Sequence, residues 1–287
     1  MILNSYAKLN LYLEVLNKRK DNYHNIKTLF ERVSLCDKII LKSRRDKKIR
    51  IICNLPDVPC DNTNLAYRSA KILQDVFHID RGVDIKIIKH IPVGAGLGGG
   101  SSNAASVLVG LSKLWRLKLV QEQLLAYARK IGSDVPFFIY NSPFAFGEGR
   151  GDRIKPLEAL DNARLWHILV VPKIKVSTPL IYKKWDTHST LTSPQYNVKI
   201  LNLGLRKNDL SLIGKALFNS LEQVSAKLYP QVRRIKKKLI NLGLKAILMS
   251  GSGPAIFGIV SSRKEALSLC RQLKKNRLWQ VFVTRTH

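Results

Sequence analysis

Apolar and polar residues alternate near the start of the chain in the pattern of a β-strand. From residue 7 to residue 15 every second position is apolar, and Lys8 and Asn10 lie between the apolar positions. This period of two is typical of a half-buried strand, so Lys8 and Asn10 should share its polar face, roughly 6–7 Å apart along the strand. Similar patterns predict strands at residues 28–35, 38–41, 50–53, 84–91, 166–171, 245–249, 255–260 and 280–284. The basic residues 42–48 indicate a hairpin tip between two of these strands.

Other segments repeat apolar residues at steps of three and four, which predicts helices with one buried face. These segments are residues 64–77, 102–115, 121–131, 211–228, 231–242 and 263–275. Strands and helices are mixed without the regular βαβ alternation of a doubly wound sheet, so we expect an α+β fold in two lobes. A stretch rich in glycine and charge, residues 147–153, suggests a boundary near residue 150. We therefore expect an N-terminal lobe at residues 1–150 and a C-terminal lobe at residues 151–287, with the last helix and strand able to pack back on the first lobe.

The composition of the 287 residues is that of a globular protein, with 45% apolar and 24% charged residues, which excludes disordered, collagen-like and disulfide-scaffold chains. The four cysteines form no CxxC pair, so we expect reduced thiols. The first residues lack the pattern of a signal peptide, and no segment of about 18 residues is apolar enough to span a membrane. These features favour a cytoplasmic protein. The net charge of +29 suits an anionic partner such as nucleic acid, lipid headgroups or a phosphorylated small molecule.

Five glycines gather at residues 94–100, between a predicted strand and a predicted helix. The segment reads Pro92-Val93-Gly94-Ala95-Gly96-Leu97-Gly98-Gly99-Gly100-Ser101-Ser102-Asn103-Ala104-Ala105. Glycines leave the backbone open to a ligand, and the free N–H groups at the start of a helix attract an anion. A phosphate chain is the expected occupant, because so flexible a segment is costly to order without a use.

Other phosphate-binding patterns fit this segment less well. Gly94, Gly96 and Gly99 satisfy GxGxxG, but the dinucleotide fold also needs a regular βαβ unit and an acidic residue about 20 positions further on. Glu122 is near that distance and lies in a predicted helix. Gly100 stands where a P-loop has its lysine, and the chain lacks the HRD and DFG motifs of protein kinases. A flexible loop without a ligand is a further alternative.

Residues 92–105 resemble the central motif of the GHMP kinases, the family of galactokinase, homoserine kinase, mevalonate kinase and phosphomevalonate kinase. Further segments are similar, in wording and in order, to one branch of that family. They are Ala7-Lys8-Leu9-Asn10-Leu11, Asp21-Asn22-Tyr23-His24, Gly132-Ser133-Asp134-Val135-Pro136-Phe137-Phe138 and Met249-Ser250-Gly251-Ser252-Gly253. The resemblance runs from about residue 5 to residue 260. It implies the two-lobed GHMP-kinase fold and the ATP-dependent phosphorylation of a small alcohol.

The resemblance implies catalytic and nucleotide-binding roles for the matching residues. Lys8 and Asp134 fall on the catalytic lysine and the catalytic aspartate of the family, which supply positive charge and a general base. From the residues alone, Asp134 could equally be the N-cap of a helix. The implied ATP contacts are Pro92, Val93, Gly94, Ala95, Gly96, Leu97, Gly98, Gly99, Gly100, Ser101, Ser102, Asn64, Leu65 and Lys89. For the last three, a helix start and an exposed strand end are the plainer alternatives.

The same branch of the family acts on a cytidyl diphosphate-methylerythritol alcohol of the non-mevalonate isoprenoid pathway. The implied substrate contacts are Asn10, Tyr23, His24, Asn103 and Tyr182. Tyr23 and His24 would hold the cytosine ring, one by stacking and one by hydrogen bonds, and Tyr182 would complete an aromatic sandwich. Solvated strand or surface positions are the alternatives, as is a helix cap for Asn103. Residues 250–253 would close the acceptor side or form a plain tight turn.

ATP is the implied co-substrate, and Mg²⁺ is expected with it because the ion neutralises charge across the β- and γ-phosphates. The sequence shows no carboxylate ligand for the ion, and only the hydroxyls of Ser101 and Ser102 are candidates. The expected partners are these small molecules, with no specific nucleic acid and no membrane, and the chain is expected to be a monomer or a homodimer. A homoserine or mevalonate type of kinase is the alternative within the family. Outside it, the alternative is a basic nucleic-acid-binding protein on a kinase fold.

Two features depart from the family pattern. Asn22 stands where glycine usually precedes the tyrosine, so Asn22 must itself adopt the turn, and asparagine tolerates a left-handed φ better than most residues. The net charge is also higher than expected of a small-molecule kinase, and much of it lies in the basic runs at residues 42–50, 233–238 and 274–277. We expect these runs to be solvated surface, with non-specific nucleic-acid binding as the alternative.

Overall fold

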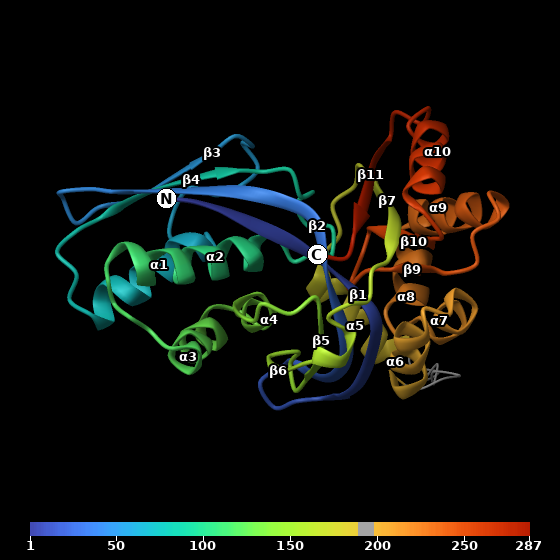
Figure 1. Cartoon of the computed structure of the whole chain (residues 1–287), viewed down its shortest axis with the longest axis horizontal. Coiled ribbons are helices and arrows are strands. Elements are labelled where there is room, and N and C mark those ends of the chain that lie inside the picture. The colour runs from blue at the N-terminus through green and yellow to red at the C-terminus, as the bar shows by residue number, and fades with distance from the viewer. Residues whose placement is uncertain (189–197) are drawn as a thin grey trace.

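Two β-sheets with flanking helices form the two lobes of the structure, a computed structural model that describes residues 1–188 and 198–287 (Figure 1). The first sheet has the strand order β3-β4-β2-β1-β8, and β5 and β6 extend it along another part of β2. Its strands are β1 (Ile2–Lys18), β2 (His24–Ser43), β3 (Ile49–Cys53), β4 (Val83–Ile88), β5 (Phe144–Glu148), β6 (Arg153–Pro156) and β8 (Phe218–Asn219). The second sheet has the order β11-β7-β10-β9, with β7 (Trp166–Pro172), β9 (Ile247–Met249), β10 (Ile256–Val260) and β11 (Trp279–Arg285). The expected α+β fold in two lobes is confirmed.

Helices flank both sheets (Figure 1). Those of the first half of the chain are α1 (Leu65–Val76), α2 (Gly99–Leu114), α3 (Gln121–Ile131) and α4 (Val135–Ile139). Those of the second half are α5 (Thr178–His188), α6 (Val198–Lys207), α7 (Leu210–Ala216), α8 (Glu222–Leu228), α9 (Pro230–Asn241) and α10 (Arg263–Leu273), with a 3₁₀ turn at Glu158–Leu160. Helix α2 shares one core with the first sheet, in which Leu108 and Ile85 are fully buried. Among the described residues, no helix is long and apolar enough to cross a membrane.

Strand β1 is buried on both faces, although its alternating pattern predicts a strand with one face in solvent. Lys8 is only 4% exposed and Asn10 only 2% exposed. The polar face is covered by two loops, because a Cβ on Gly98 would lie 2.9 Å from Cγ of Lys8 and a Cβ on Gly251 would lie 3.4 Å from Oδ1 of Asn10. The half-buried expectation is therefore wrong, and the two polar side chains lie at the junction of segments far apart in the sequence.

Two expectations fail in the first lobe because strand pairing overrides local pattern. The runs predicted at residues 28–35 and 38–41 form one strand, β2, along which β5 and β4 pair one after the other. Residues 42–48 are not a hairpin tip, since β4 lies between β2 and β3 in the sheet. Residues 147–153 include the turn between the paired strands β5 and β6, so the first sheet continues to Pro156.

The predicted helix at residues 211–228 is interrupted by strand β8, which pairs in parallel with β1. Val15 N donates to Ser220 Oγ (3.0 Å), and Ser220 N donates to Leu13 O (2.9 Å). These contacts join the segment after α7 to β1 and outweigh the helical period of the segment. The residue after the last strand also reaches the first sheet, because Thr286 bridges to Val33 of β2.

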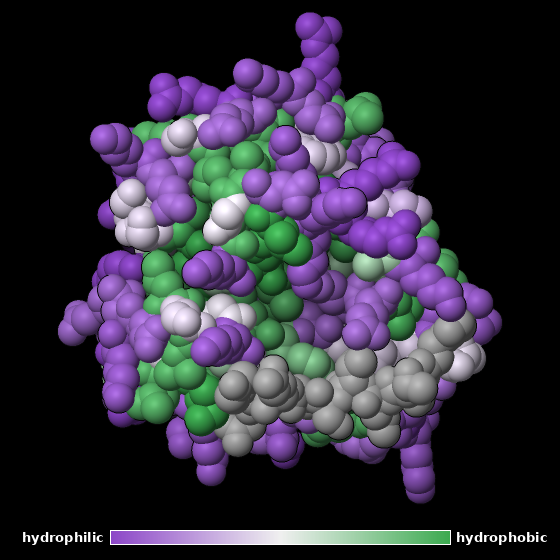
Figure 2. All heavy atoms as spheres, turned by 90° about the vertical axis from the view of Figure 1, so that its right-hand side faces the viewer, coloured by the Kyte–Doolittle hydropathy of each residue, from purple (hydrophilic) through white to green (hydrophobic). Residues whose placement is uncertain are grey.

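The basic runs lie on the surface. Helix α9 buries Val232, Ile235 and Leu239 and exposes Arg233 and Arg234 on its opposite side. Figure 2 shows the face that lies on the right of Figure 1, where hydrophilic side chains surround a smaller hydrophobic area. The charge excess is thus carried at least in part by solvated faces of regular helices.

Candidate active site

Two cavities meet at the glycine loop, residues 92–98, which connects β4 to α2. The larger has a volume of about 590 Å³ and the smaller about 330 Å³, and Gly96 and Gly98 line both. The larger cavity is lined by six residues with predicted catalytic or acceptor roles: Lys8, Asn10, Tyr23, His24, Asp134 and Tyr182. The smaller is lined by the residues with predicted ATP roles, Asn64, Leu65, Lys89 and residues 92–101. The two cavities thus share part of the glycine loop as a common wall.

Two predicted residues lie against or behind the glycine loop. Asn103, which is expected to reach the substrate or a phosphate, lines the smaller cavity. Ser102 is 2% exposed, and its hydroxyl accepts a hydrogen bond from Ser5 Oγ (2.8 Å). Both side chains therefore point into the protein behind the loop.

The glycine loop approaches its neighbours too closely for side chains at two positions. Gly96 has a φ of +77°, and a Cβ there would lie 2.1 Å from the backbone oxygen of Ser250. Gly98 has a φ of +67°, and a Cβ there would lie 2.9 Å from Cγ of Lys8. Ser250 Oγ donates to Gly96 O (3.0 Å). The loop is held against β1 and against the turn between β9 and β10.

Helix α2 begins directly after the glycine loop, and its first N–H groups have no side-chain cap. Gly98 is the N-cap, and the first turn of this described helix contains no acidic residue. A Cβ on Gly100 would meet nothing within 4 Å, so this backbone faces open space. Free N–H groups and the positive end of the helix dipole favour an anion here. The residues therefore fit the phosphate chain that the sequence predicts.

Lys8, Asn10 and Asp134 form a polar group in the larger cavity. Lys8 Nζ donates to Asn10 Oδ1 (2.5 Å) and lies 3.5 Å from Asp134 Oδ2. Asn10 Nδ2 donates to Thr28 Oγ1 (2.8 Å), which in turn donates to the backbone oxygen of Tyr12 (2.7 Å). Asn10 is fixed through Thr28, so the ammonium of Lys8 is held at one place in the cavity.

Asp134 occupies the N-cap position of α4, yet its side chain makes no capping hydrogen bond within the described chain. The side chain is 32% exposed, whereas that of Lys8 is 5% exposed. A carboxylate with free oxygen lone pairs beside an ammonium can accept a proton from an alcohol. The geometry therefore agrees better with the predicted base than with the capping alternative.

Aromatic rings gather at the other end of the larger cavity. Tyr23 is 52% exposed, and the guanidinium carbon of Arg150 lies 5.1 Å from the centre of its ring. His24 stacks on Tyr182, with ring centres 5.0 Å apart. Asn22 has a φ of +64°, so the left-handed turn predicted for it is confirmed. These rings offer flat surfaces for a planar ligand.

Lys89 belongs to a buried polar cluster behind the glycine loop. Its Nζ forms an ion pair with Asp37, which has no exposed surface. The other oxygen of Asp37 accepts from the backbone N–H groups of His90 (2.7 Å) and Ile91 (2.8 Å). Asn103 Nδ2 donates to Asp37 Oδ2 (2.9 Å). Asp37 thereby fixes the segment that leads into the loop, a role that no local sequence signal announces.

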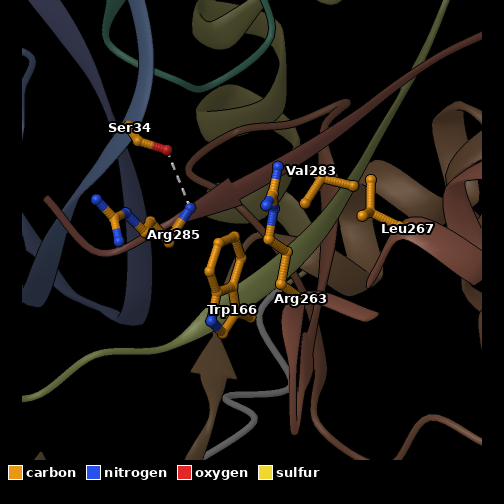
Figure 3. Close-up of a pocket in the computed structure, with 6 residues that line it drawn as sticks. All are labelled: Ser34, Trp166, Arg263, Leu267, Val283 and Arg285. Atoms are coloured by element: carbon orange, nitrogen blue, oxygen red, sulfur yellow. Dashed lines mark hydrogen bonds between the residues drawn. The ribbon is translucent and has the colours of Figure 1, made fainter. Parts of the chain in front are cut away.

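A third cavity, about 650 Å³ in volume, lies apart from these two (Figure 3). Its described lining consists of Ser34, Trp166, Arg263, Leu267, Val283 and Arg285. Figure 3 shows Trp166 between the two arginine side chains. No carboxylate or histidine lies among these lining residues.

Comparison with protein families agrees with this site. The family model of the GHMP kinases N terminal domain matches residues 64–142. The model of the GHMP kinases C terminal matches residues 201–277. The first match includes the glycine loop and Asp134, and the second includes the turn between β9 and β10.

Curated relatives align over most of the chain. A 4-diphosphocytidyl-2-C-methyl-D-erythritol kinase of Geobacillus sp. (strain WCH70) is 42% identical over 91% of this chain and 88% of its own length. The enzyme of that name from Alkaliphilus metalliredigens is 39% identical over 94% of this chain and 91% of its own length. A crystal structure of 4-(cytidine 5'-diphospho)-2C-methyl-D-erythritol kinase superposes with a TM-score of 0.84, at 32% identity and complete coverage of both chains. The Methanococcus jannaschii mevalonate kinase, at 16% identity and a TM-score of 0.77 over 100% of this chain and 98% of that one, shares the fold.

Proposed function

The chain belongs to the GHMP kinase family and, within it, to the 4-diphosphocytidyl-2-C-methyl-D-erythritol kinases. We propose that it transfers the γ-phosphoryl group of ATP to the 2-hydroxyl of 4-diphosphocytidyl-2-C-methyl-D-erythritol, giving the 2-phosphate and ADP. The observation that carries this proposal is the junction of the two cavities at Gly96 and Gly98, with Lys8 and Asp134 in the larger one.

The smaller cavity takes the nucleotide. Its phosphates lie along the glycine loop and the uncapped start of α2, which supply N–H donors and the helix dipole. Asn64 and Leu65 also line this cavity, and the adenine would bind beside them. The γ-phosphoryl group then points across Gly96 and Gly98 into the larger cavity.

The larger cavity takes the acceptor alcohol. Asp134 removes the proton of the 2-hydroxyl while the hydroxyl oxygen forms a bond to the γ-phosphorus. The bond from that phosphorus to the β,γ-bridging oxygen breaks, and ADP leaves. The ammonium of Lys8, 3.5 Å from Asp134, stabilises the negative charge on the transferring group. Asn10 holds Lys8 in place through its hydrogen bond. The aromatic end of the cavity, with Tyr23, His24 and Tyr182, receives the cytosine base.

Mg²⁺ belongs to the proposal as the companion of ATP, where it would neutralise charge on the phosphates. The described residues contain no group of three or more histidine, cysteine, aspartate or glutamate side chains that could hold a metal ion. This donor set suits an ion ligated mainly by phosphate oxygens and water, with few protein ligands. The hydroxyl of Ser101, which lines the smaller cavity, is the candidate protein ligand.

The test is ADP release from Mg-ATP with three acceptors under one set of conditions: the cytidyl diphosphate-methylerythritol, mevalonate and homoserine. Turnover with the cytidyl compound alone supports the proposal. Turnover with mevalonate or homoserine would keep the phosphate loop and discard the cytosine pocket. If no acceptor is turned over, the basic surface would be tested next, by titration with nucleic acid at two salt concentrations.

A further inference from the structure

Asp186 lies on α5, one helical turn after Tyr182, and its carboxylate joins two residues of the first lobe. One oxygen lies 2.6 Å from His24 Nε2, and the other accepts from Lys18 Nζ (3.0 Å). All four side chains line the larger cavity. The sequence analysis assigned no role to Asp186, because its partners lie more than 160 residues away in the chain.

Asp186 determines which nitrogen of His24 carries the proton. Burial alone would raise the pKa of Asp186, but the hydrogen bonds from His24 and Lys18 outweigh it, and the pKa lies below its usual value. The carboxylate is therefore ionised at neutral pH and can only accept hydrogen bonds. His24 Nε2 must then be the N–H donor, and in a neutral imidazole this arrangement leaves Nδ1 as the acceptor. Nδ1 makes no hydrogen bond to any described residue.

The ring of His24 is also held in its plane. Tyr182 stacks on it at 5.0 Å, and Trp185 contacts it edge-on at 5.7 Å. The side chain of His24 is only 5% exposed. The orientation of the ring is thus fixed by α5 on both counts, by packing and by the hydrogen bond to Asp186.

A fixed acceptor distinguishes the two pyrimidine bases. Cytosine carries an exocyclic amino group, a donor, at the position where uracil carries a carbonyl oxygen, an acceptor. An unprotonated Nδ1 accepts a hydrogen bond from the cytosine amino group. Facing uracil, the lone pair of Nδ1 would instead be repelled by a lone pair of the carbonyl oxygen. On the basis of the proposed function, we propose that Asp186 is a positioning residue that fixes the Nε2–H form of His24. The acceptor cavity thereby selects cytosine over uracil.

The proton position can be measured without activity, in the full chain labelled with ¹⁵N-histidine at pH 8, where free imidazole is neutral. The signals of His24 are identified by their loss in His24→Gln. We expect the Nε2–H form in the wild type and a mixture of both forms in Asp186→Ala. A wild-type His24 in the Nδ1–H form would overturn the proposal, whether or not the proposed reaction is found.

Selectivity is measured with the cytidyl acceptor and its synthetic uridyl analogue. We expect Asp186→Ala to raise KM for the cytidyl acceptor by about tenfold, to leave kcat within about twofold, and to lower the preference for cytidyl over uridyl by about tenfold, the scale of one lost base contact. KM for ATP reports on the fold and should not change. Asp75→Ala, which breaks an exposed ion pair with Lys71 on α1, is the matched control, with unchanged selectivity.

The outcomes separate the two levels of the argument. A wild type that does not phosphorylate the cytidyl acceptor refutes the proposed function, and the ¹⁵N measurement still decides the role of Asp186. A wild type that does so, together with an Asp186→Ala variant that weakens both acceptors equally, shows a role in packing alone and overturns the selectivity proposal. Asp186→Asn keeps the shape and can either accept from or donate to Nε2, so its selectivity should fall between wild type and Asp186→Ala.

Discussion

Two lysine–aspartate pairs lie near the glycine loop, and they differ in how much of their capacity the protein itself uses. Lys8 lies 3.5 Å from Asp134, whose side chain is 32% exposed to the larger cavity. Lys89 pairs with Asp37, which has no exposed surface and accepts further hydrogen bonds from the backbone and from Asn103. The carboxylate of Asp134 has oxygen lone pairs free to contact a substrate. The carboxylate oxygens of Asp37 are already engaged in the hydrogen bonds that hold the loop. Proximity of opposite charges therefore does not identify a reactive pair. A carboxylate whose oxygens have hydrogen-bonding capacity left for a substrate does.

Asp134→Asn tests the pair of Lys8 and Asp134 and should have the largest effect on activity. The amide cannot take a proton from the acceptor alcohol, so we expect turnover to fall by a factor of about 10²–10⁴. Steady-state ADP release measures this loss. ATP binding, followed by calorimetry, should stay nearly intact, because Asp134 lines the larger cavity. Near-normal turnover would contradict the assignment of Asp134 as the general base.

Asp37→Asn makes the same change in the buried pair of Lys89 and Asp37. It leaves the ammonium of Lys89 buried without its counter-charge, and breaking a buried pair in this way costs about 3–5 kcal/mol of stability. The free energy of unfolding in urea measures the loss. For Asp134→Asn we expect a smaller loss in the same measurement, because the distance from Lys8 Nζ to Asp134 Oδ2 is 3.5 Å and the carboxylate is 32% exposed. If both variants lose stability equally, the distinction between the pairs is wrong.

Asn103 lies beside the buried pair of Lys89 and Asp37 and gives a further test of the difference between the two pairs. Asn103 donates to Ser5 Oγ (2.8 Å) and Asp37 Oδ2 (2.9 Å), so Asn103→Ala leaves buried acceptors unsatisfied. We expect a loss of about 1–3 kcal/mol in stability and an acceptor KM within about twofold of wild type. Thermal and urea unfolding together with acceptor titrations measure both. A raised acceptor KM at unchanged stability would instead support the substrate contact that the sequence predicts for Asn103.

Most regular elements could be predicted because their signal is local. Helix α3 has the predicted bounds, residues 121–131, since its apolar residues repeat at helical spacing and Gly132 ends it. Strand β8 was missed because it has two residues and exists only through its pairing with β1. The single strand β2 and the position of β4 beside it depend in the same way on partners remote in sequence.

The candidate site divides along the same line. Motif positions such as Lys8 and Asp134 were predicted because each lies inside a short pattern, although their roles rest on the resemblance and stay predictions. Asp37 and Asp186 carry no such pattern, and what defines them is contact with Lys89 and His24, at separations of 52 and 162 residues. Residues whose function is to hold another residue are thus the ones that a single sequence conceals.

The smallest expected effect concerns Asn64, which combines features of both kinds of residue. It lines the smaller cavity, where the resemblance predicts a contact with ATP. Its side chain is nevertheless engaged, because Oδ1 accepts from Ala66 N (2.9 Å) as the N-cap of α1 and Nδ2 donates to Pro59 O (2.7 Å). By the rule drawn from the two pairs, it should act as a structural residue. We therefore expect Asn64→Ala to cost about 1 kcal/mol of stability with KM for ATP within about twofold.

Asn64→Ser separates the two roles, because serine caps a helix about as well as asparagine but cannot reach as far into the cavity. If the residue is structural, serine restores the free energy of unfolding that alanine loses, and KM for ATP is that of the wild type in both variants. If serine restores stability while KM for ATP stays raised by fivefold or more, Asn64 binds the nucleotide with a side chain whose hydrogen bonds the protein already uses. That result would break the rule, since a saturated residue would then have to exchange a protein partner for ATP when the nucleotide binds.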